Sequence, residues 1–460
     1  MLLLTAGPPK GIPLPLLRKT LIALLVLALL GTAEQATAAT SAHATATAHA
    51  KKKPAKKKKR KKKKAKATAL VVCASGCKYA TLQQAVDAAA PKATITVRPG
   101  KYVGGATVKG HRKDGLVIQG GGTTPRETVL EGKGASGIPA QNGILVDGAD
   151  NVTMRNLDAE NFVANGFFVR GVHGYVMDHV VAGFNHGYGL YAFESIGGRM
   201  TNSESYGAGD SGYYVGATVP QDKPEKTLIA HNQSYENVLG YSGTNSRYVD
   251  IRDNEFYNNG AGIVPNTLQS EKYGPADQNS ITENLVYWNN FNYYKPDSPV
   301  KTSPQAVGGF NYPTGAGIVL FGIHNTTVRA NLVFGNFKWG IATFSDPTYA
   351  TASSQGNKMT FNTMGAAFGD ENGVDFYTDG TGPGNCWENN STGATFDQGG
   401  QPQALLYPSC SAGTPETADP VQEAKLGEYA TKSQGQEDEW KKHPHPGRPD
   451  RTPIDGQPTT

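Results

Sequence analysis

Residues 143–146 (GILV), 166–169 (GFFV), 189–192 (GLYA) and 212–215 (GYYV) each begin with a glycine, and these glycines lie 23 residues apart. Gly317 and Gly340 open two further apolar segments at the same spacing. A fixed period of this length indicates a repeat architecture, and the apolar residues after each glycine are typical of a buried strand. We therefore predict a solenoid in which one strand of each coil pairs in parallel with the next.

Polar residues recur in step with the glycines. One set is Asn156, His179, Asn202, Asn232, Asn254, Asn284, Asn331 and Asn362, and a second follows five residues later at Asn161, Asn237, Asn259, Asn289 and Asn336. Asparagine tolerates left-handed backbone, and its amide can bond to the copy in the next coil. We predict asparagine ladders at the turns, with a structural role.

Each end of the predicted solenoid carries a stabilising feature: a capping helix and a disulfide at the N-terminal end, and a second disulfide at the C-terminal end. Leu82, Ala85, Val86 and Ala89 share one helical face, and Thr81 and Gln84 have the spacing of a capping box, which predicts a helix over the open first coil. Cys73 with Cys77 and Cys386 with Cys410 are the disulfide pairs favoured by proximity. A metal site is the weaker interpretation, because the sequence has no Cys-x-x-Cys and no histidine pair at ligand spacing nearby.

Residues 1–39 resemble a secretory signal peptide, with Arg18 and Lys19 before an apolar run from Leu21 to Leu30. This run is shorter than the roughly 20 residues of a membrane span, so a signal peptide is favoured over an uncleaved anchor. We expect a protein that is secreted or associated with the cell surface.

Residues 40–69 form an Ala/Thr/Lys-rich linker that we expect to be disordered. Lys51–Lys66 holds thirteen Lys and Arg residues, so the net charge of +5 becomes 5 − 13 = −8 without it. Such a segment stays solvated and attracts polyanions. An anionic cell-wall polymer or membrane surface is the expected partner rather than a specific nucleic acid, although a plain charged spacer fits equally well.

The body is predicted to span residues 70–412 as a monomer, followed by a disordered polar tail at 413–460. Insertions at 217–226, 267–279 and 291–315 break the 23-residue period. Insertions into a solenoid form loops at its corners, and the first two interrupt the same part of their coils. We expect those two loops to emerge on one side.

Alternation along the glycine-led strands places Phe168, Tyr191 and Tyr214 on the outside of three successive coils. Rungs about 4.8 Å apart would align these rings, with Tyr188 beside them, as a strip that stacks against sugars. The alternative is a strip covered by the inserted loops.

Charged residues of the same coils suggest two kinds of chemistry. A uronic-acid lyase needs a cation for the substrate carboxylate, here Arg170, and a base, here His186 or Tyr188. A glycoside hydrolase needs two carboxylates, here Glu194 and Asp210. Neither set is specific, since each residue also has a plausible structural role.

Two resemblances support the fold. Residues 81–122 resemble the entry to pectin-acting β-helix proteins, and Tyr188-Gly-Leu-Tyr-Ala-Phe-Glu-Ser195 followed by Gly209-Asp-Ser-Gly-Tyr-Tyr-Val-Gly216 resembles a family of secreted bacterial β-helix repeat proteins of the pectate-lyase-like superfold. The resemblance implies an all-β, right-handed parallel β-helix of about 10–12 coils. The chain departs from that family at Ser211, at Tyr213 and at Ile263–Asn266, so an acidic site at the last segment is not carried over.

The sequence therefore predicts an extracellular polysaccharide-binding protein, with lyase or hydrolase activity as an extension. The alternative is a non-enzymatic adhesion or structural module held to an anionic wall by its lysine-rich segment. Complete polygalacturonase, pectinesterase and alginate-epimerase motifs are missing. No cofactor is predicted. Calcium is kept as an alternative without a motif, because Asp253-Asn-Glu255 lacks the aspartate cluster of a calcium-dependent pectate lyase.

Overall fold

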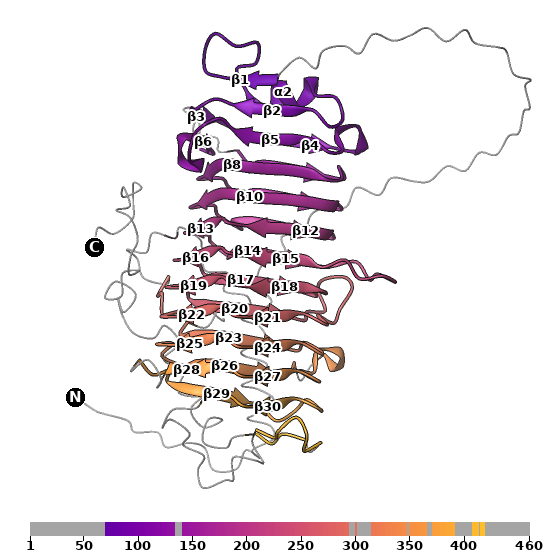
Figure 1. Cartoon of the computed structure of the whole chain (residues 1–460), viewed down its shortest axis with the longest axis vertical. Helices are drawn as coiled ribbons and strands as arrows, with labels where there is room; N and C mark the ends of the chain where they lie inside the picture. Colours follow the sequence, from indigo (N-terminus) through magenta and orange to yellow (C-terminus); the bar gives the residue numbers. More distant parts are fainter. Residues whose placement is uncertain are drawn as a thin grey trace, which may run out of the picture.

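The computed structural model describes residues 70–133, 140–293, 300, 314–346, 349–365, 370–391, 407–413 and 415–418. The predicted signal peptide, the Lys51–Lys66 segment and the tail beyond residue 418 lie outside these residues. The described chain winds into a long stack of parallel strands (Figure 1). No helix in the described ranges is both long enough and apolar enough to cross a lipid bilayer.

Each coil contributes strands to three sides of the stack. The ten-stranded sheet contains β4 (Ala106–Lys109), β7 (Asn142–Asp147), β9 (Asn165–Arg170), β11 (Leu190–Phe193), β14 (Ser211–Gly216), β17 (Leu239–Thr244), β20 (Ala261–Asn266), β23 (Ala316–Phe321), β26 (Trp339–Phe344) and β29 (Val374–Thr378). Every pairing within it is parallel and joins consecutive coils.

The other strands form two adjoining side sheets. The first side sheet contains β1 (Leu70–Val72), β2 (Thr94–Val97), β5 (Val117–Gly120), β8 (Val152–Glu160), β10 (His173–Gly183), β12 (Ile196–Thr201), β15 (Thr227–Ala230), β18 (Val249–Arg252), β21 (Ser280–Thr282), β24 (Thr327–Arg329), β27 (Lys358–Thr360) and β30 (Cys386–Glu388). The second contains β3 (Gly100–Val103), β6 (Thr128–Glu131), β13 (Glu204–Tyr206), β16 (Gln233–Tyr235), β19 (Glu255–Tyr257), β22 (Leu285–Tyr287), β25 (Leu332–Phe334) and β28 (Thr363–Met364). Strands β8 and β10 are long enough to belong to both.

Few described residues are helical. The helical segments are α2 (Leu82–Ala88) and the short 3-10 turns η1 (His111–Lys113), η2 (Pro125–Glu127) and η3 (Ala350–Ala352). The prediction of an all-β solenoid with one N-terminal helix is confirmed.

The glycine near the start of the strands of the ten-stranded sheet is required by close approach of the next coil. A Cβ atom on Gly143 would lie 2.5 Å from the carbonyl oxygen of Gly166, and one on Gly317 would lie 2.5 Å from that of Gly340. The residue that follows points into the core, as Ile144 and Phe167 show at 0% exposure. The 23-residue glycine period therefore reports the register of the coils directly.

Buried asparagine amides link successive coils on the inside of the turns. Asn232 Nδ2 donates to Asn254 Oδ1 at 2.9 Å, and Asn254 Nδ2 donates to Asn284 Oδ1 at 3.0 Å. This ladder continues through Asn331 and Asn362 to Asn390. A second ladder runs through Asn237, Asn259, Asn289, Asn336 and Asn372. Each amide also donates to a backbone carbonyl, so the polar groups of the turns are satisfied within the core.

The prediction that one asparagine supplies both the left-handed turn and the amide ladder is wrong in detail. The left-handed residue is the preceding one, His231 (φ 58°), while Asn232 carries the ladder. In earlier coils Asn156 (φ 53°) and Asn202 (φ 51°) are the left-handed residues. The residue after Asn202 is Ser203, whose backbone N–H donates to Asn232 Oδ1 at 2.9 Å. The two roles separate because the left-handed residue turns its side chain toward solvent, whereas its neighbour points inward.

The predicted capping helix and the two predicted disulfides are confirmed. Gln84 N donates to Thr81 Oγ1 at 3.3 Å and Thr81 N donates to Gln84 Oε1 at 3.3 Å, closing the capping box of α2. The disulfides join Cys73 to Cys77 and Cys386 to Cys410. Beyond the second disulfide, buried Glu416 accepts hydrogen bonds from Asn385 Nδ2 at 2.7 Å and Trp387 Nε1 at 3.1 Å.

Replacing Asn259 by alanine is expected to destabilise the solenoid by about 2–4 kcal/mol, because it leaves the Asn237 amide and the Ser234 carbonyl without their partner in a fully buried site. Chemical denaturation measures this loss. The control is Asn202→Gly, at an exposed left-handed position, which should change stability by less than about 1 kcal/mol. Equal losses of stability in the two variants would contradict a stabilising role of the asparagine ladder.

Candidate functional site

Three outward side chains lie in register on the ten-stranded sheet. Phe168 pairs with Tyr191 across β9 and β11, and Tyr191 pairs with Tyr214 across β11 and β14. Their neighbours Phe167, Leu190 and Tyr213 point the other way, into the core, at 0% exposure. This alternation follows from the pleat of the strands.

Together with Tyr188, these rings form the aromatic cluster. The rings of Phe168 and Tyr191 stack face to face, with centroids 4.3 Å apart and planes 5° apart. Tyr188 is tilted against Tyr191 at 4.4 Å and against Tyr214 at 4.7 Å, and Tyr214 meets Tyr191 edge-on at 4.9 Å. Phe168, Tyr188 and Tyr191 are half-buried, whereas Tyr214 is 3% exposed. The surface open to a ligand therefore ends at Tyr191 and Tyr188.

Tyr214 is buried because its ring lies along its own strand and beneath an inserted loop. A Cβ atom on Gly216 would lie 2.3 Å from a ring carbon of Tyr214, so only glycine leaves room for this orientation. The loop that follows β20 returns over the ring. It is held by Asn245, whose Nδ2 donates to the carbonyls of Leu268 at 3.0 Å and Glu271 at 2.9 Å.

This loop brings the Glu271 carboxyl to the aromatic cluster. The Tyr214 hydroxyl donates to Glu271 Oε1 at 2.9 Å, while Oε2 is buried without a hydrogen-bond partner in the described part of the chain. Burial raises the pKa of Glu271 to about 7, and the charges of Asp210 and Glu194 oppose its ionisation further, although the Tyr214 hydrogen bond favours it. A carboxyl that titrates near neutral pH is suited to general acid–base chemistry.

Most of the charged residues predicted from the sequence gather around this point. The pKa of Tyr191 is raised by burial and by the charges of Glu271 and Asp210. Glu194 raises the pKa of the same phenol, whereas Arg170 lowers it.

Each of these charges already has a partner. Arg170 lies 3.1 Å from Asp147 Oδ2, and Glu194 Oε1 lies 2.7 Å from Lys272 Nζ. Asp210, at 3% exposure, accepts a hydrogen bond from Ser211 Oγ at 2.6 Å. Arg170 and Glu194 must exchange a partner to engage a substrate, and Asp210 acts only through its charge while it stays buried.

His186 stands apart from the group. Its side chain is exposed on the turn between β10 and β11. Of the two residues predicted as a base, only Tyr188 lies in the aromatic cluster.

Glu271 was not among the residues predicted from the sequence. Its hydrogen bond to Tyr214 spans 57 residues of chain, so no local pattern marks it. The available signal was the inserted segment 267–279, expected to emerge at a binding side, with an acid–base pair, Glu271-Lys272, in it.

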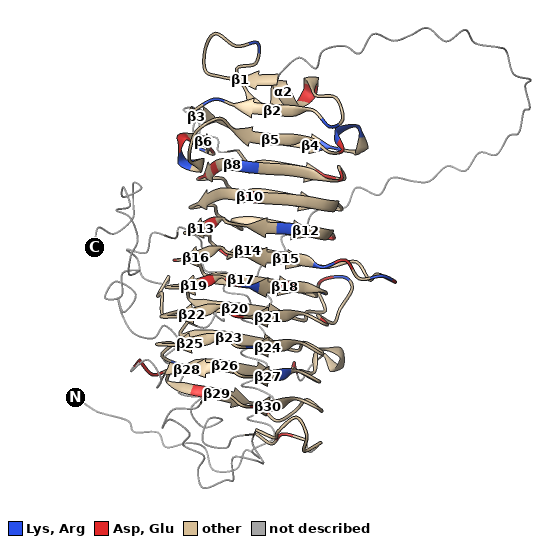
Figure 2. Ribbon diagram, in the orientation of Figure 1, with Lys and Arg blue, Asp and Glu red and all other residues tan. Residues whose placement is uncertain are grey.

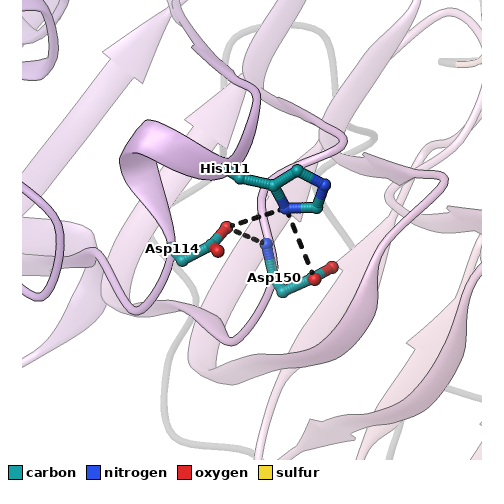
Figure 3. A group of neighbouring side chains, drawn as sticks. All are labelled: His111, Asp114 and Asp150. Carbon is teal, nitrogen blue, oxygen red and sulfur yellow. Dashed lines mark hydrogen bonds and ion pairs between the residues drawn. The ribbon is translucent and has the colours of Figure 1, made fainter. Parts of the chain in front are cut away.

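A second cluster of polar side chains lies nearer the N-terminal end. His111, Asp114 and Asp150 point toward one another, with potential ligand atoms all within 4.8 Å (Figure 3). The cluster already ties η1 to the turn after β7, because Asp114 Oδ1 accepts from the Asp150 amide at 2.9 Å. Its histidine is exposed, and these contacts account for it as a structural ion-pair cluster.

Residues 102–284 match the family model described as a right handed beta helix region, in agreement with the strand topology. A search of curated proteins found no match. Similar solved structures include the A-module of the mannuronan C-5 epimerase AlgE4 of Azotobacter vinelandii, at 15% identity and a TM-score of 0.42, covering 67% of this chain and 90% of that one.

Two further similar structures are the periplasmic alginate epimerase AlgG, at 12% identity and a TM-score of 0.41, covering 65% of this chain and 77% of that one, and the DFA-IIIase of Arthrobacter chlorophenolicus A6, at 10% identity and a TM-score of 0.38, covering 65% and 84%. Similarities of this size do not transfer an activity.

The raised pKa of Glu271 predicts a specific pH dependence of stability. A carboxyl whose pKa rises from 4.5 to about 7 on folding stabilises the protein below about pH 4.5, and this stabilisation is lost as the pH rises through 7. Glu271→Gln removes the effect, so from pH 5 to pH 8 the free energy of unfolding of the variant should gain about 2.5 kcal/mol relative to that of the wild type.

Denaturation curves at both pH values measure this difference, with exposed Glu283→Gln as the control. A difference between wild type and Glu271→Gln that does not change with pH would contradict the burial of an ionisable group at this position.

Proposed function

We propose that this chain is an extracellular protein that binds a polysaccharide at the aromatic cluster and cleaves it with Glu271 as the acid–base group. The observation that carries the proposal is the contact between the Tyr214 hydroxyl and the buried Glu271 carboxyl, directly beside the half-exposed Phe168–Tyr191 stack. The two disulfides fit an oxidising compartment outside the cytoplasm.

The cluster suits a sugar because it combines apolar ring surface with hydroxyl groups at its edge. Stacking covers one face of Phe168 and one of Tyr191, so a pyranose would contact their outer edges and the tilted ring of Tyr188. Aromatic side chains with a polar tip bind ligands that have an apolar face and polar substituents. Arg170 adds a cation beside the aromatic cluster. Its charge favours an acidic sugar, whose carboxylate would replace Asp147 as the partner of the guanidinium group.

Two kinds of cleavage fit the charged groups. In hydrolysis, protonated Glu271 would donate to the leaving oxygen and Glu194, released from Lys272, would be the second carboxylate. In elimination, ionised Glu271 would accept the C5 proton of a uronic acid while Arg170 neutralises its carboxylate. The C4–O bond would then break to form the C4–C5 double bond, and the leaving oxygen would take a proton from water. A pKa of about 7 populates both forms of Glu271 at neutral pH, and the products distinguish the two routes.

Binding and cleavage should separate in two variants tested against a panel of uronic-acid and neutral polysaccharides. Tyr191→Ala should weaken binding about tenfold or more through the lost ring contact, whereas Phe361→Ala, which removes an exposed ring elsewhere, should not. Glu271→Gln should retain binding and lose at least a hundredfold in the rate of new reducing or unsaturated ends. Absence of both binding and product across the panel would rule out the proposal.

A second candidate is a non-enzymatic module held at the cell surface by its lysine-rich segment. The observation that favours it is the run of thirteen Lys and Arg residues in Lys51–Lys66. Deleting residues 51–66 should then release the protein from an anionic cell-wall fraction at low salt, with the wild type released only as the salt concentration rises. Unchanged retention of the deletion variant would contradict an electrostatic anchor.

A further inference from the structure

The outward face of the first side sheet carries a regular row of cations. Its strands stack in register in the order β8, β10, β12, β15, β18, β21 and β24. The cationic positions are Arg155 on β8, Arg199 on β12, Arg252 on β18 and Arg329 on β24. The alternating strands β10, β15 and β21 hold no Lys or Arg. One arginine therefore recurs on every second rung, and these four residues are the arginine row.

The arginine row is open to solvent. Arg155, Arg199 and Arg329 are exposed, and Arg252 is partly exposed. Figure 2 shows blue segments on β8 and β12, on the side turned to the viewer. Arg155, Arg252 and Arg329 occupy one column of the sheet, and Arg199 occupies the next column, two residues along its strand. Because neighbouring rungs are about 4.8 Å apart, the row repeats about every 10 Å along the solenoid.

The rungs between the arginines are flat. Apart from Asp178 on β10, their outward positions hold short or apolar side chains, namely Val176, Leu228, Ala230, Ser280 and Thr282. A long ligand that follows the solenoid therefore meets a cation on one rung and a low surface on the next.

Two guanidinium groups of the row are held by uncharged neighbours. Arg155 Nη2 donates to Gln119 Oε1 at 2.6 Å. The guanidinium group of Arg329 lies 4.8 Å from the centroid of the Phe361 ring. These contacts orient the two side chains and leave their charges unneutralised, which reduces the entropy lost when a ligand binds.

The acidic residues of the face already have partners. Asp178 Oδ1 accepts a hydrogen bond from Thr201 Oγ1 at 2.7 Å. Asp253 Oδ2 lies 2.7 Å from Arg252 Nη1, and Asp250 Oδ2 lies 3.8 Å from Arg252 Nε. Arg252 must therefore exchange a partner to engage a ligand, whereas the other arginines of the row need not.

The face is positive in a chain that carries −8 outside Lys51–Lys66. From β8 to β27, the outward positions of the first side sheet hold the four arginines, Lys358 and two aspartates, which gives 5 − 2 = +3. The bordering turns add Asp253 and Glu283, so 3 − 2 = +1 remains with the histidines neutral. The expected ligand is a polyanion that contacts the arginine row rather than the turns.

We propose that this face binds a linear acidic polysaccharide that runs along the solenoid, with one carboxylate at each residue of the arginine row. In an extended chain of alternating acidic and neutral sugars, each disaccharide advances about 10 Å, which is the length of two rungs. A guanidinium group suits a carboxylate because it can donate two parallel hydrogen bonds to it. The face lies on a different side of the solenoid from the aromatic cluster, so this binding is separate from the proposed cleavage.

The length of the row sets the length of the ligand. Arg155 and Arg329 are six rungs apart, or about 29 Å, which corresponds to three disaccharide steps and four carboxylates. Affinity for hyaluronan oligosaccharides, which carry one carboxylate per disaccharide, should therefore rise from four to eight sugars and then level off. Isothermal titration calorimetry at low salt measures this, with the full chain and with a variant that lacks residues 51–66, because that basic segment attracts any polyanion.

Paired substitutions test the row directly. Arg199→Gln combined with Arg329→Gln should weaken binding of the hyaluronan octasaccharide about tenfold or more, because two of the four charge-assisted contacts are lost. Arg98→Gln combined with Arg112→Gln removes the same charge from exposed positions outside the row and should change the affinity less than about twofold. Tyr191→Ala, in the aromatic cluster, should leave this binding unchanged.

Several outcomes would overturn the proposal. They are absence of binding by the variant lacking residues 51–66, equal losses in the two paired variants, and loss of octasaccharide binding in Tyr191→Ala alone. Equal affinity for four and eight sugars would also overturn it. So would equally tight binding of a single-stranded DNA oligonucleotide with the same number of charges, because the face would then attract polyanions without regard to their spacing.

Discussion

The hydrogen bonds between stacked asparagine amides are the constraint on which the rest of this structure depends. A turn that points polar backbone groups into a solenoid interior must satisfy them there, and Asn254, Asn284 and Asn331 do so only when each lies directly above the next. The same requirement holds at Asn259, Asn289 and Asn336. The buried asparagine amides therefore fix the register between each coil and the next.

A register set from inside also aligns whatever points outward. Phe168 stacks on Tyr191, and Tyr235 stacks on Tyr257. These rings are aligned because the buried residues beside them fix the register between neighbouring strands. The two outward rows lie on different sides of the solenoid and meet different surroundings. One is half-open beside Glu271, and the other is buried among acidic residues. The same architecture thus aligns outward side chains on two sides of the solenoid in different surroundings.

Features that repeat with the coil were predictable from the sequence, and features made by the loops were not. Gly143 and Gly166 report the register because the backbone of the next coil excludes a side chain, and the Thr81–Gln84 capping box follows from local spacing. The separate roles of His231 and Asn232 could not be predicted, because both residues belong to the same turn and either could adopt the left-handed conformation that His231 has in the structure.

The candidate site was predictable only in part for the same reason. Alternation placed Tyr191 outside, but the burial of Tyr214 depends on the path of the loop after β20, which Asn245 holds through its side-chain amide. Glu271 reaches the site through that path alone. The repeat pattern predicts the geometry of the coils. The position of an inserted loop depends instead on contacts with residues far away in the sequence, which the pattern does not contain.

The most direct test of the account is a crystal structure of the protein carrying Glu271→Gln with an oligosaccharide that the wild type binds. The account predicts sugar rings in contact with Phe168, Tyr188 and Tyr191, with the residue at position 271 within hydrogen-bonding distance of a glycosidic oxygen or a ring substituent. An oligosaccharide bound on another side of the solenoid, with the aromatic cluster uncovered, would contradict it.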